Sequence, residues 1–167
     1  MKRIWIAAGV LGMSLFALLG ARLAWADDDD EHEERGGRLV LRQPMLPAYQ
    51  QECAACHMAY PPGMLPAASW QALMNGLPRH FGSDASLDDA TVKQLNTWLT
   101  AHAAPASVMA RPPQDRITRS AWFIHKHDEV SASVWKRPAV KSAANCVACH
   151  AGAEQGDFNE HRVRIPR

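Results

Sequence analysis

The sequence has almost no excess of either charge, with 18 Lys plus Arg against 17 Asp plus Glu in 167 residues. A strongly basic nucleic-acid-binding protein is therefore excluded. An apolar content of 47% likewise excludes a long disordered polymer. The chain also lacks the length of a large enzyme, because beyond its N-terminal segment it can hold one ordinary domain or two very small ones. Very small domains need a disulfide, a metal or a cofactor to stabilise them.

Long apolar runs are almost absent, and the one that exists lies at the beginning of the chain. Two basic residues precede an uncharged, mostly apolar run from Ile4 to Leu19, and Ala24-Trp25-Ala26 matches a signal-peptidase site. The pattern predicts an export signal at residues 1–26, cleaved before Asp27. An uncleaved membrane anchor is the alternative, since the run approaches the length that spans a bilayer. Either way we expect the rest of the chain to lie in the periplasm, outside the reducing cytoplasm.

Cysteine is scarce, and its arrangement is the strongest signal in the sequence. All four cysteines fall in two copies of one motif, Cys53-Ala54-Ala55-Cys56-His57 and Cys146-Val147-Ala148-Cys149-His150. On a helical turn, two cysteines three residues apart point to one side, where they can add to the two vinyl groups of a haem. The histidine that follows can reach the iron as its proximal ligand. We therefore predict two covalently attached haem c groups, with His57 and His150 as iron ligands.

Two other uses of four cysteines explain the pattern less well. The two pairs are separated by 89 residues, whereas the pairs of a zinc ribbon are separated by roughly 15 to 20. Two disulfides would suit an exported protein, but disulfide spacing gives no reason for a histidine at the same place twice. The repeated histidine therefore favours haem over both alternatives.

One haem motif in each half of the chain suggests its organisation. Residues 27–43 are acidic and then basic with no apolar period, which predicts a flexible leader. For residues 44–104 we predict three helices: one beginning near Pro47 and ending in the first motif, one over 67–75, and one capped by Ser86 with Asp89. This order resembles a class I cytochrome c domain, in which Trp98 of the closing helix packs on the first helix.

The sequence of residues 105–167 predicts a different organisation from that of residues 44–104. Only 120–130 has a convincing helical period, and the haem motif lies near the end of the chain. A haem buries a large apolar face, which can replace a core that this segment cannot build from side chains alone. We expect a small, irregular domain organised around the second haem, and a mainly α fold for the protein as a whole.

The sixth ligand of each iron decides what the haem can do. A methionine in that position gives the iron a higher reduction potential than a second histidine does. Met58 adjoins His57, and Met64 belongs to the turn that follows it, so neither can cross to the opposite haem face. Met74 suits the core, and Met109 is a weak candidate. We expect packing roles for all of them and for Met45.

Histidines are better candidates than methionines. His80 lies in a loop between Pro78 and Gly82, 23 residues after His57, which is enough chain to go around the haem edge. For the second haem we favour His127, because a helix would place it on the same face as Phe123 and Val130. His125 faces Asp128 at +3, as a solvent-exposed side chain would. His125 and His102 remain the alternatives to His127.

Several longer segments resemble the small exported dihaem cytochromes c known as the DHC type. They cover nearly all of residues 44–167 and include Glu52 to Pro62, Pro66 to Trp70, Leu77 to Gly82, Arg116 to Thr118, Asn145 to His150 and Gly156 to Phe158. The resemblance implies a class I cytochrome domain followed by a second haem domain of unusual fold, with both irons bound by two histidines and close together. On this pattern His80 and His127 match the sixth ligands.

The expected function is electron transfer, because two six-coordinate haems leave no open iron site for a substrate. A small haem enzyme or a gas-binding protein with one five-coordinate haem is the alternative. The resemblance implies two redox partners, an oxygen-binding monohaem cytochrome c and a membrane dihaem cytochrome b. We expect a monomer that is not an enzyme, with no small-molecule substrate and no nucleic-acid partner.

Overall fold

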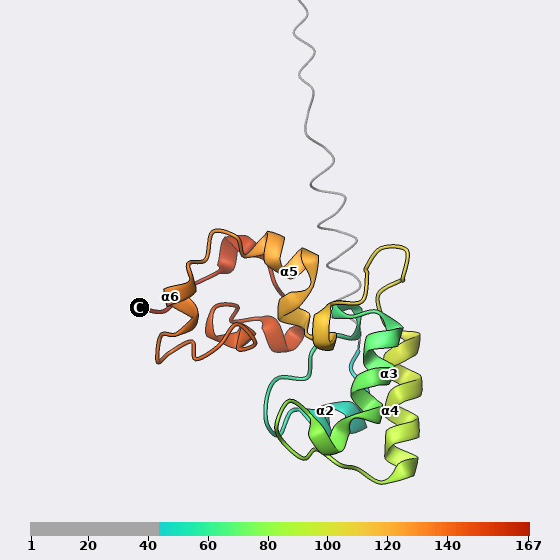
Figure 1. The fold of residues 1–167 in the computed structure, drawn as a ribbon. Helices are drawn as coiled ribbons and strands as arrows, with labels where there is room; N and C mark the ends of the chain where they lie inside the picture. The colour runs from blue at the N-terminus through green and yellow to red at the C-terminus, as the bar shows by residue number, and fades with distance from the viewer. Residues whose placement is uncertain (1–43) are drawn as a thin grey trace, which may run out of the picture.

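The computed structural model describes residues 44–167, so the predicted signal segment 1–26 and leader 27–43 lie outside the described residues. Across 44–167 the chain forms five α-helices and seven short 3-10 turns and no β-strand. Within these residues the backbone forms two isolated β-bridges, one between Pro66 and Ala104 and one between His80 and Ser83. The predicted mainly α fold is therefore confirmed (Figure 1).

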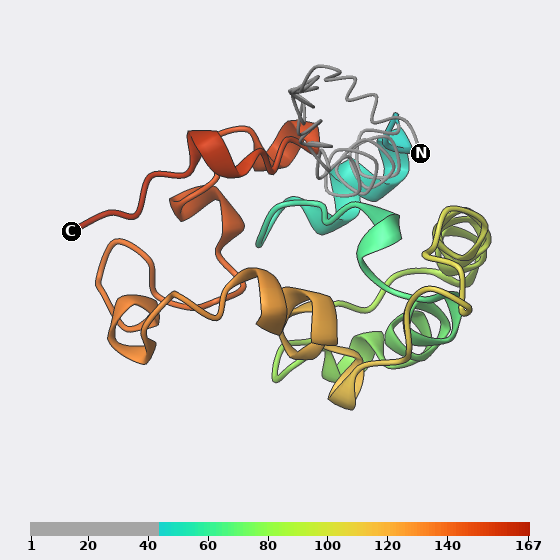
Figure 2. The ribbon, with the colours of Figure 1, turned by 90° about the horizontal axis from the view of Figure 1, so that it is seen from above.

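The helices follow one another as α2 (Pro47–Cys53), α3 (Ala67–Asn75), α4 (Asp89–Ala101), α5 (Ala121–Lys126) and α6 (Ala132–Trp135). The 3-10 turns between and after them are η1 (Pro62–Met64), η2 (Leu77–Arg79), η3 (Pro113–Asp115), η4 (Ile117–Arg119), η5 (Cys146–Ala148), η6 (Ala153–Gln155) and η7 (Glu160–Arg162). Figures 1 and 2 show α2, α3 and α4 on one side of the molecule and α5, α6 and the C-terminal turns on the other. None of the helices described between residues 44 and 167 has the length and apolar character needed to cross a bilayer.

The first three helices begin and end where their residues require. Pro47 occupies the start of α2, where its missing N–H costs nothing. The second helix has the predicted bounds, and the N–H of Gly76 closes it on the carbonyl of Leu73. The predicted cap of the third helix was wrong. Asp88 caps α4 by accepting from the N–H of Thr91, while Ser86 donates its hydroxyl to Asp84 instead.

The main apolar core lies among these three helices. Leu95 and Leu99 of α4 are buried, and α4 packs along α3, which adds the buried Trp70. Tyr49 of α2 contacts Trp98 with ring centroids 5.3 Å apart, so the predicted packing of Trp98 on the first helix is confirmed. Fully burying each large apolar side chain stabilises the fold by about 1.5–3 kcal/mol.

Residues 105–167 bury few apolar side chains, as predicted for a segment that relies on a haem. Four buried apolar residues are described there, and they are scattered along the chain: Phe123, Val134, Val140 and Ala153. The hydroxyl of Ser120 caps α5 by accepting from the N–H of Phe123. With so small a core, this segment needs another source of apolar contact.

The predicted helix over 120–130 was too long, because α5 ends at Lys126. The backbone leaves the helical conformation at His127, whose φ and ψ are −128° and 18°. The N–H of His127 donates to the carbonyl of Ile124, three residues back, rather than to that of Phe123. The Phe123 carbonyl oxygen is 2.8 Å from Nδ1 of the His127 ring. This tighter last turn ends the helix at the residue before His127.

Candidate functional site: two histidine pairs

The first histidine pair joins the N-terminal motif to the loop after η2. The rings of His57 and His80 lie with their centroids 6.1 Å apart and their planes 29° from parallel. His80 follows η2 in an extended conformation, and the next two residues, Phe81 and Gly82, both have positive φ, 50° and 101°. This reversal closes with the N–H of Ser83 donating to the His80 carbonyl at 3.0 Å. The turn thus holds His80 opposite a residue 23 positions earlier.

The second pair has the same spacing and a different orientation. The rings of His127 and His150 have centroids 6.1 Å apart and planes 75° from parallel. His127 is the residue after α5, and His150 is the last residue of the second motif, whose first three residues form η5. The structure therefore brings each predicted proximal histidine to the predicted partner.

Hydrogen bonds orient one ring in each pair. Nδ1 of His57 is 2.7 Å from the carbonyl oxygen of Met58, and Nδ1 of His127 is 2.8 Å from that of Phe123. A ring that donates from Nδ1 keeps Nε2 unprotonated, which is the state that binds a metal. The Nδ1 atoms of His80 and His150 are buried and have no hydrogen-bond partner within residues 44–167.

Burial controls the charge of several groups at the two sites. It lowers the pKa of His80, and the neighbouring His57 lowers it further. It lowers the pKa of His150 in the same way, with His127 as the second cause. Both effects favour the neutral imidazole, which is the form that binds a metal. Burial also raises the pKa of Cys53 and of Cys146 to about 11, so both are neutral thiols at neutral pH.

Aromatic side chains surround the histidines. Tyr60 stacks on His57 with centroids 4.9 Å apart, and Phe123 stacks on His127 at 4.1 Å. The other ring contacts are Phe81 with His80, Trp135 with His127 and Phe158 with His150. These rings provide the apolar walls that a porphyrin needs, and they limit the rotation of the imidazoles.

The four cysteines lie at the ends of short helical segments rather than within long ones. Cys53 is the last residue of α2, and Cys56 follows it in a turn. Cys146 begins η5, and Cys149 caps it. All four are unpaired thiols, so neither motif is closed by a disulfide.

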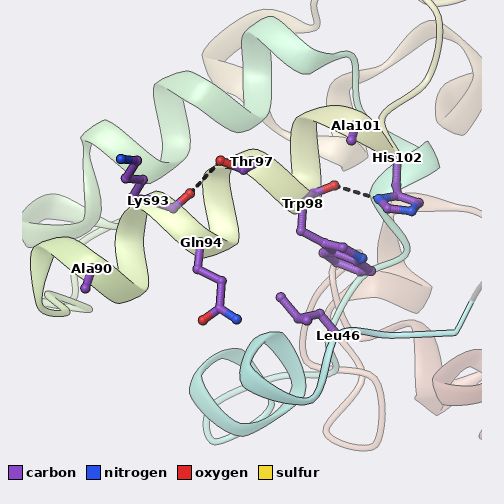
Figure 3. Close-up of a pocket in the computed structure, with 8 residues that line it drawn as sticks. All are labelled: Leu46, Ala90, Lys93, Gln94, Thr97, Trp98, Ala101 and His102. Carbon is purple, nitrogen blue, oxygen red and sulfur yellow. Dashed lines mark hydrogen bonds between the residues drawn. The ribbon is translucent and has the colours of Figure 1, made fainter.

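His125 and His102, the alternatives to His127, belong to neither histidine pair. His125 is exposed on α5. His102 caps the C-terminal end of α4, where its Nδ1 bonds the Trp98 carbonyl at 2.8 Å, as expected for a histidine at a helix end. Trp98 and His102 line an open surface groove of about 590 Å³, and Figure 3 shows Leu46 beside the Trp98 ring.

The methionines that could have served as sixth ligands are mostly packing residues. Met74 belongs to the main core, and Met64 is only 3% exposed. Met109 is half-buried in the loop before η3.

The residues present fit haem better than a zinc ion. No three His, Cys, Asp or Glu side chains gather as a metal-ion site in the described part of the chain. Two imidazoles on opposite sides of one metal, each at about 2 Å, have ring centroids roughly 6 Å apart. Both observed pairs match this spacing, and a porphyrin supplies the remaining four donors. Cys53 with Cys56, and Cys146 with Cys149, lie next to the pairs as thiols able to form thioethers.

Comparison with known proteins agrees with haem as the bound group. Residues 49–158 match the family model described as dihaem cytochrome c. A diheme cytochrome type c from Shewanella baltica OS155 aligns with a TM-score of 0.65 and 40% identity over 74% of this chain and 95% of that chain. DHC from Rhodobacter sphaeroides aligns with a TM-score of 0.61 and 48% identity over 69% and 98%. A second structure, a diheme cytochrome c from the same organism, gives 0.61 and 45% identity over 68% and 97%. No curated protein matches the chain.

The helical fold and the two motifs define a c-type cytochrome with two covalently bound haem c groups. More particularly, the chain belongs to the dihaem cytochrome c family. This membership indicates haem-based electron transfer.

Two residues near the histidines were not singled out from the sequence. Tyr60 contacts both the first histidine pair and the C-terminal half, and Arg116 lies over the ring of Phe81. Both occur in the segments that resemble the DHC type, but their partners are distant in the sequence. Nothing local in the pattern marks them.

Proposed function

We propose that the protein is an exported electron carrier in which two histidines bind each iron. His57 and His80 bind the first, and His127 and His150 bind the second. Cys53 and Cys56 attach the first haem, and Cys146 and Cys149 attach the second. The observation that supports this most strongly is the 6.1 Å centroid distance found in both pairs, since it is the spacing of two imidazoles across one metal.

Each haem, when bound, supplies a one-electron Fe(III)/Fe(II) couple. The protein residues fix the environment of that couple. Two imidazoles would hold each iron, one from each side of the haem, and would leave no open site for a substrate. The carbonyls of Met58 and Phe123 hold one ring of each pair in place, so the ligands keep their geometry when the charge at the iron changes. Low reorganisation of this kind favours electron transfer over ligand chemistry.

The alternative is a haem enzyme or gas-binding protein with one five-coordinate iron. The second histidine that lies 6.1 Å from each proximal histidine argues against this alternative. Carbon monoxide binding to the reduced holoprotein tests the two functions. The electron carrier shows no spectral change at neutral pH, whereas a five-coordinate haem gives a carbonyl complex. His80→Ala serves as the positive control, since it opens the first iron.

Location and partners form the rest of the proposal. The pattern of residues 1–26 supports export to the periplasm with cleavage before Asp27. Sequencing the N-terminus of the secreted holoprotein tests this, and a start at Met1 contradicts it.

By family resemblance we propose an oxygen-binding monohaem cytochrome c and a membrane dihaem cytochrome b as redox partners of the monomer. Stopped-flow mixing of the reduced holoprotein with each oxidised partner measures the electron transfer.

A further inference from the structure

Tyr60 contacts both haem motifs. Its ring stacks on His57, with centroids 4.9 Å apart and planes 30° from parallel. Its hydroxyl donates to the carbonyl oxygen of Ala144 at 2.7 Å, across 84 residues of sequence. Ala144 precedes Cys146 by two residues. A single side chain therefore runs from the proximal histidine of the first motif to the backbone beside the first cysteine of the second.

Both ends of this bridge are fixed by other contacts. The backbone carbonyl of Tyr60 accepts from the hydroxyl of Tyr49, a core residue of α2, at 2.9 Å. At the other end, the N–H of Ala144 donates to the hydroxyl of Ser142. Tyr60 itself is half-buried. A short hydrogen bond between two held segments transmits position, because neither end can move away without breaking a contact.

We propose that Tyr60 is a positioning residue that couples the two haem motifs and so sets the rate of electron exchange between the haems. This inference rests on the proposed function. The exchange moves one electron from a ferrous to a ferric iron, and it makes or breaks no bond and transfers no proton. Its rate depends on how closely and rigidly the two motifs are held. The Tyr60 ring, its hydrogen bond and the Ala144 to Cys146 backbone form a short connection between them.

Three variants of the holoprotein separate the effect of the Tyr60 hydrogen bond from that of its ring stacking. Tyr60→Phe removes only the hydroxyl and keeps the ring on His57. Tyr60→Leu removes the stacking as well. Thr100→Val is the matched control, since it removes a hydroxyl that donates to the Asn96 carbonyl at 2.7 Å, a hydrogen bond that stays within α4. Rapid photoreduction of one equivalent, followed in the visible region, measures the electron exchange, and electron paramagnetic resonance of the oxidised protein reports the axial ligands.

We expect Tyr60→Phe to slow the interhaem exchange several-fold while both ferric spectra stay unchanged. Tyr60→Leu should slow it at least as much and also alter the spectrum of the first haem. Thr100→Val should leave the exchange unchanged. If Tyr60→Phe exchanges electrons as fast as wild type, or slows the exchange no more than Thr100→Val does, the inference is wrong. A high-spin wild-type spectrum would instead refute the proposed function on which the inference rests.

Discussion

Arg116 lies over the ring of Phe81, with its Cζ 4.1 Å from the ring centroid. Phe81 directly follows His80, and Arg116 belongs to the segment between η3 and η4, so the contact joins the two halves of the chain beside the first histidine pair. Phe81 nevertheless stays 46% exposed. A guanidinium over an aromatic face contributes about 0.5–1 kcal/mol at such a site. We expect its charge to act on the haem held beside His80 as well.

Arg116→Gln should therefore lower the reduction potential of one haem. Reduction adds negative charge to the haem, and a nearby cation stabilises the reduced state, so removing the cation favours the oxidised state. A spectroelectrochemical titration of the holoprotein measures both couples. Arg119→Gln changes the same charge at an exposed position on η4 and should shift the couples less. Equal shifts in the two variants would show that the position of Arg116 has no special effect.

The two histidines around the end of α5 should differ sharply in their variants. His127→Ala removes a proposed iron ligand and should convert one haem to a high-spin form that binds carbon monoxide. His125→Ala, two residues earlier on the exposed side of α5, should leave both haems low-spin. Absorption spectra of the ferric and ferrous holoproteins measure this. A high-spin His125→Ala protein with a normal His127→Ala protein would contradict the assignment.

Gly152→Ala should destabilise the loop after the second motif. A Cβ at this position would lie 2.8 Å from the Cβ of Asp157, and Asp157 is held by a salt bridge to Arg162 and by the N–H of Asn159. Forcing an extra carbon into such a site costs about 1–3 kcal/mol. Thermal unfolding of the holoprotein measures the loss, with Ala151→Ser at the exposed neighbouring position as the control. An unchanged midpoint for Gly152→Ala would show that Asp157 moves freely.

Acid pH should weaken the ion pair between Arg111 and Asp115, the last residue of η3. Arg111 donates to both oxygens of Asp115, at 2.6 and 2.8 Å, and this holds the pKa of Asp115 below its ordinary value. A carboxylate with a lowered pKa stabilises the fold at pH values above its ordinary pKa of about 4, and this stability is lost as the pH falls through the lowered value. The free energy of unfolding of Asp115→Asn should thus approach that of wild type as the pH falls from neutral to acid. A difference that is independent of pH would exclude this ion pair as its source.

The sequence was sufficient for the parts of the site that repeat a motif or follow local rules. The two C-x-x-C-H motifs predicted two haem groups, and the helix from Ala67 to Asn75 closed at Gly76 as its residues required. The position of Trp98 against Tyr49 followed from the class I pattern. The assignments of His80 and His127 as ligands remain predictions, although the structure brings each to its expected partner.

Other features depend on atoms far apart in the sequence or on local hydrogen bonds that the sequence does not mark. No pattern indicated that the N–H of His127 would donate to Ile124 and that α5 would end at Lys126. Asp88 rather than Ser86 caps α4, because Asp84 takes the Ser86 hydroxyl. Tyr60 and Ala144 are 84 residues apart, so their contact exists only in the folded chain. The division at residues 104 and 105 likewise remains a prediction.

The two histidine pairs should give two different ferric spectra. The planes of His57 and His80 are 29° from parallel, whereas those of His127 and His150 are 75° apart. Nearly parallel rings interact with the same iron d orbital and give a rhombic signal. Nearly perpendicular rings leave two d orbitals close in energy and give a strongly anisotropic one. Low-temperature electron paramagnetic resonance should show both signals in equal amounts, and two identical rhombic signals would contradict the observed orientations.

Near-infrared magnetic circular dichroism of the fully oxidised holoprotein is the sharpest test of two histidines at each iron, because the energy of the ligand-to-iron band identifies the axial ligands. We expect only the band of bis-histidine low-spin haem, with an intensity that corresponds to two haems per chain. A sulfur-to-iron band from either haem would contradict it and make Met64, Met74 or Met109 a ligand. A high-spin band would contradict it as well, by leaving one iron without its second histidine.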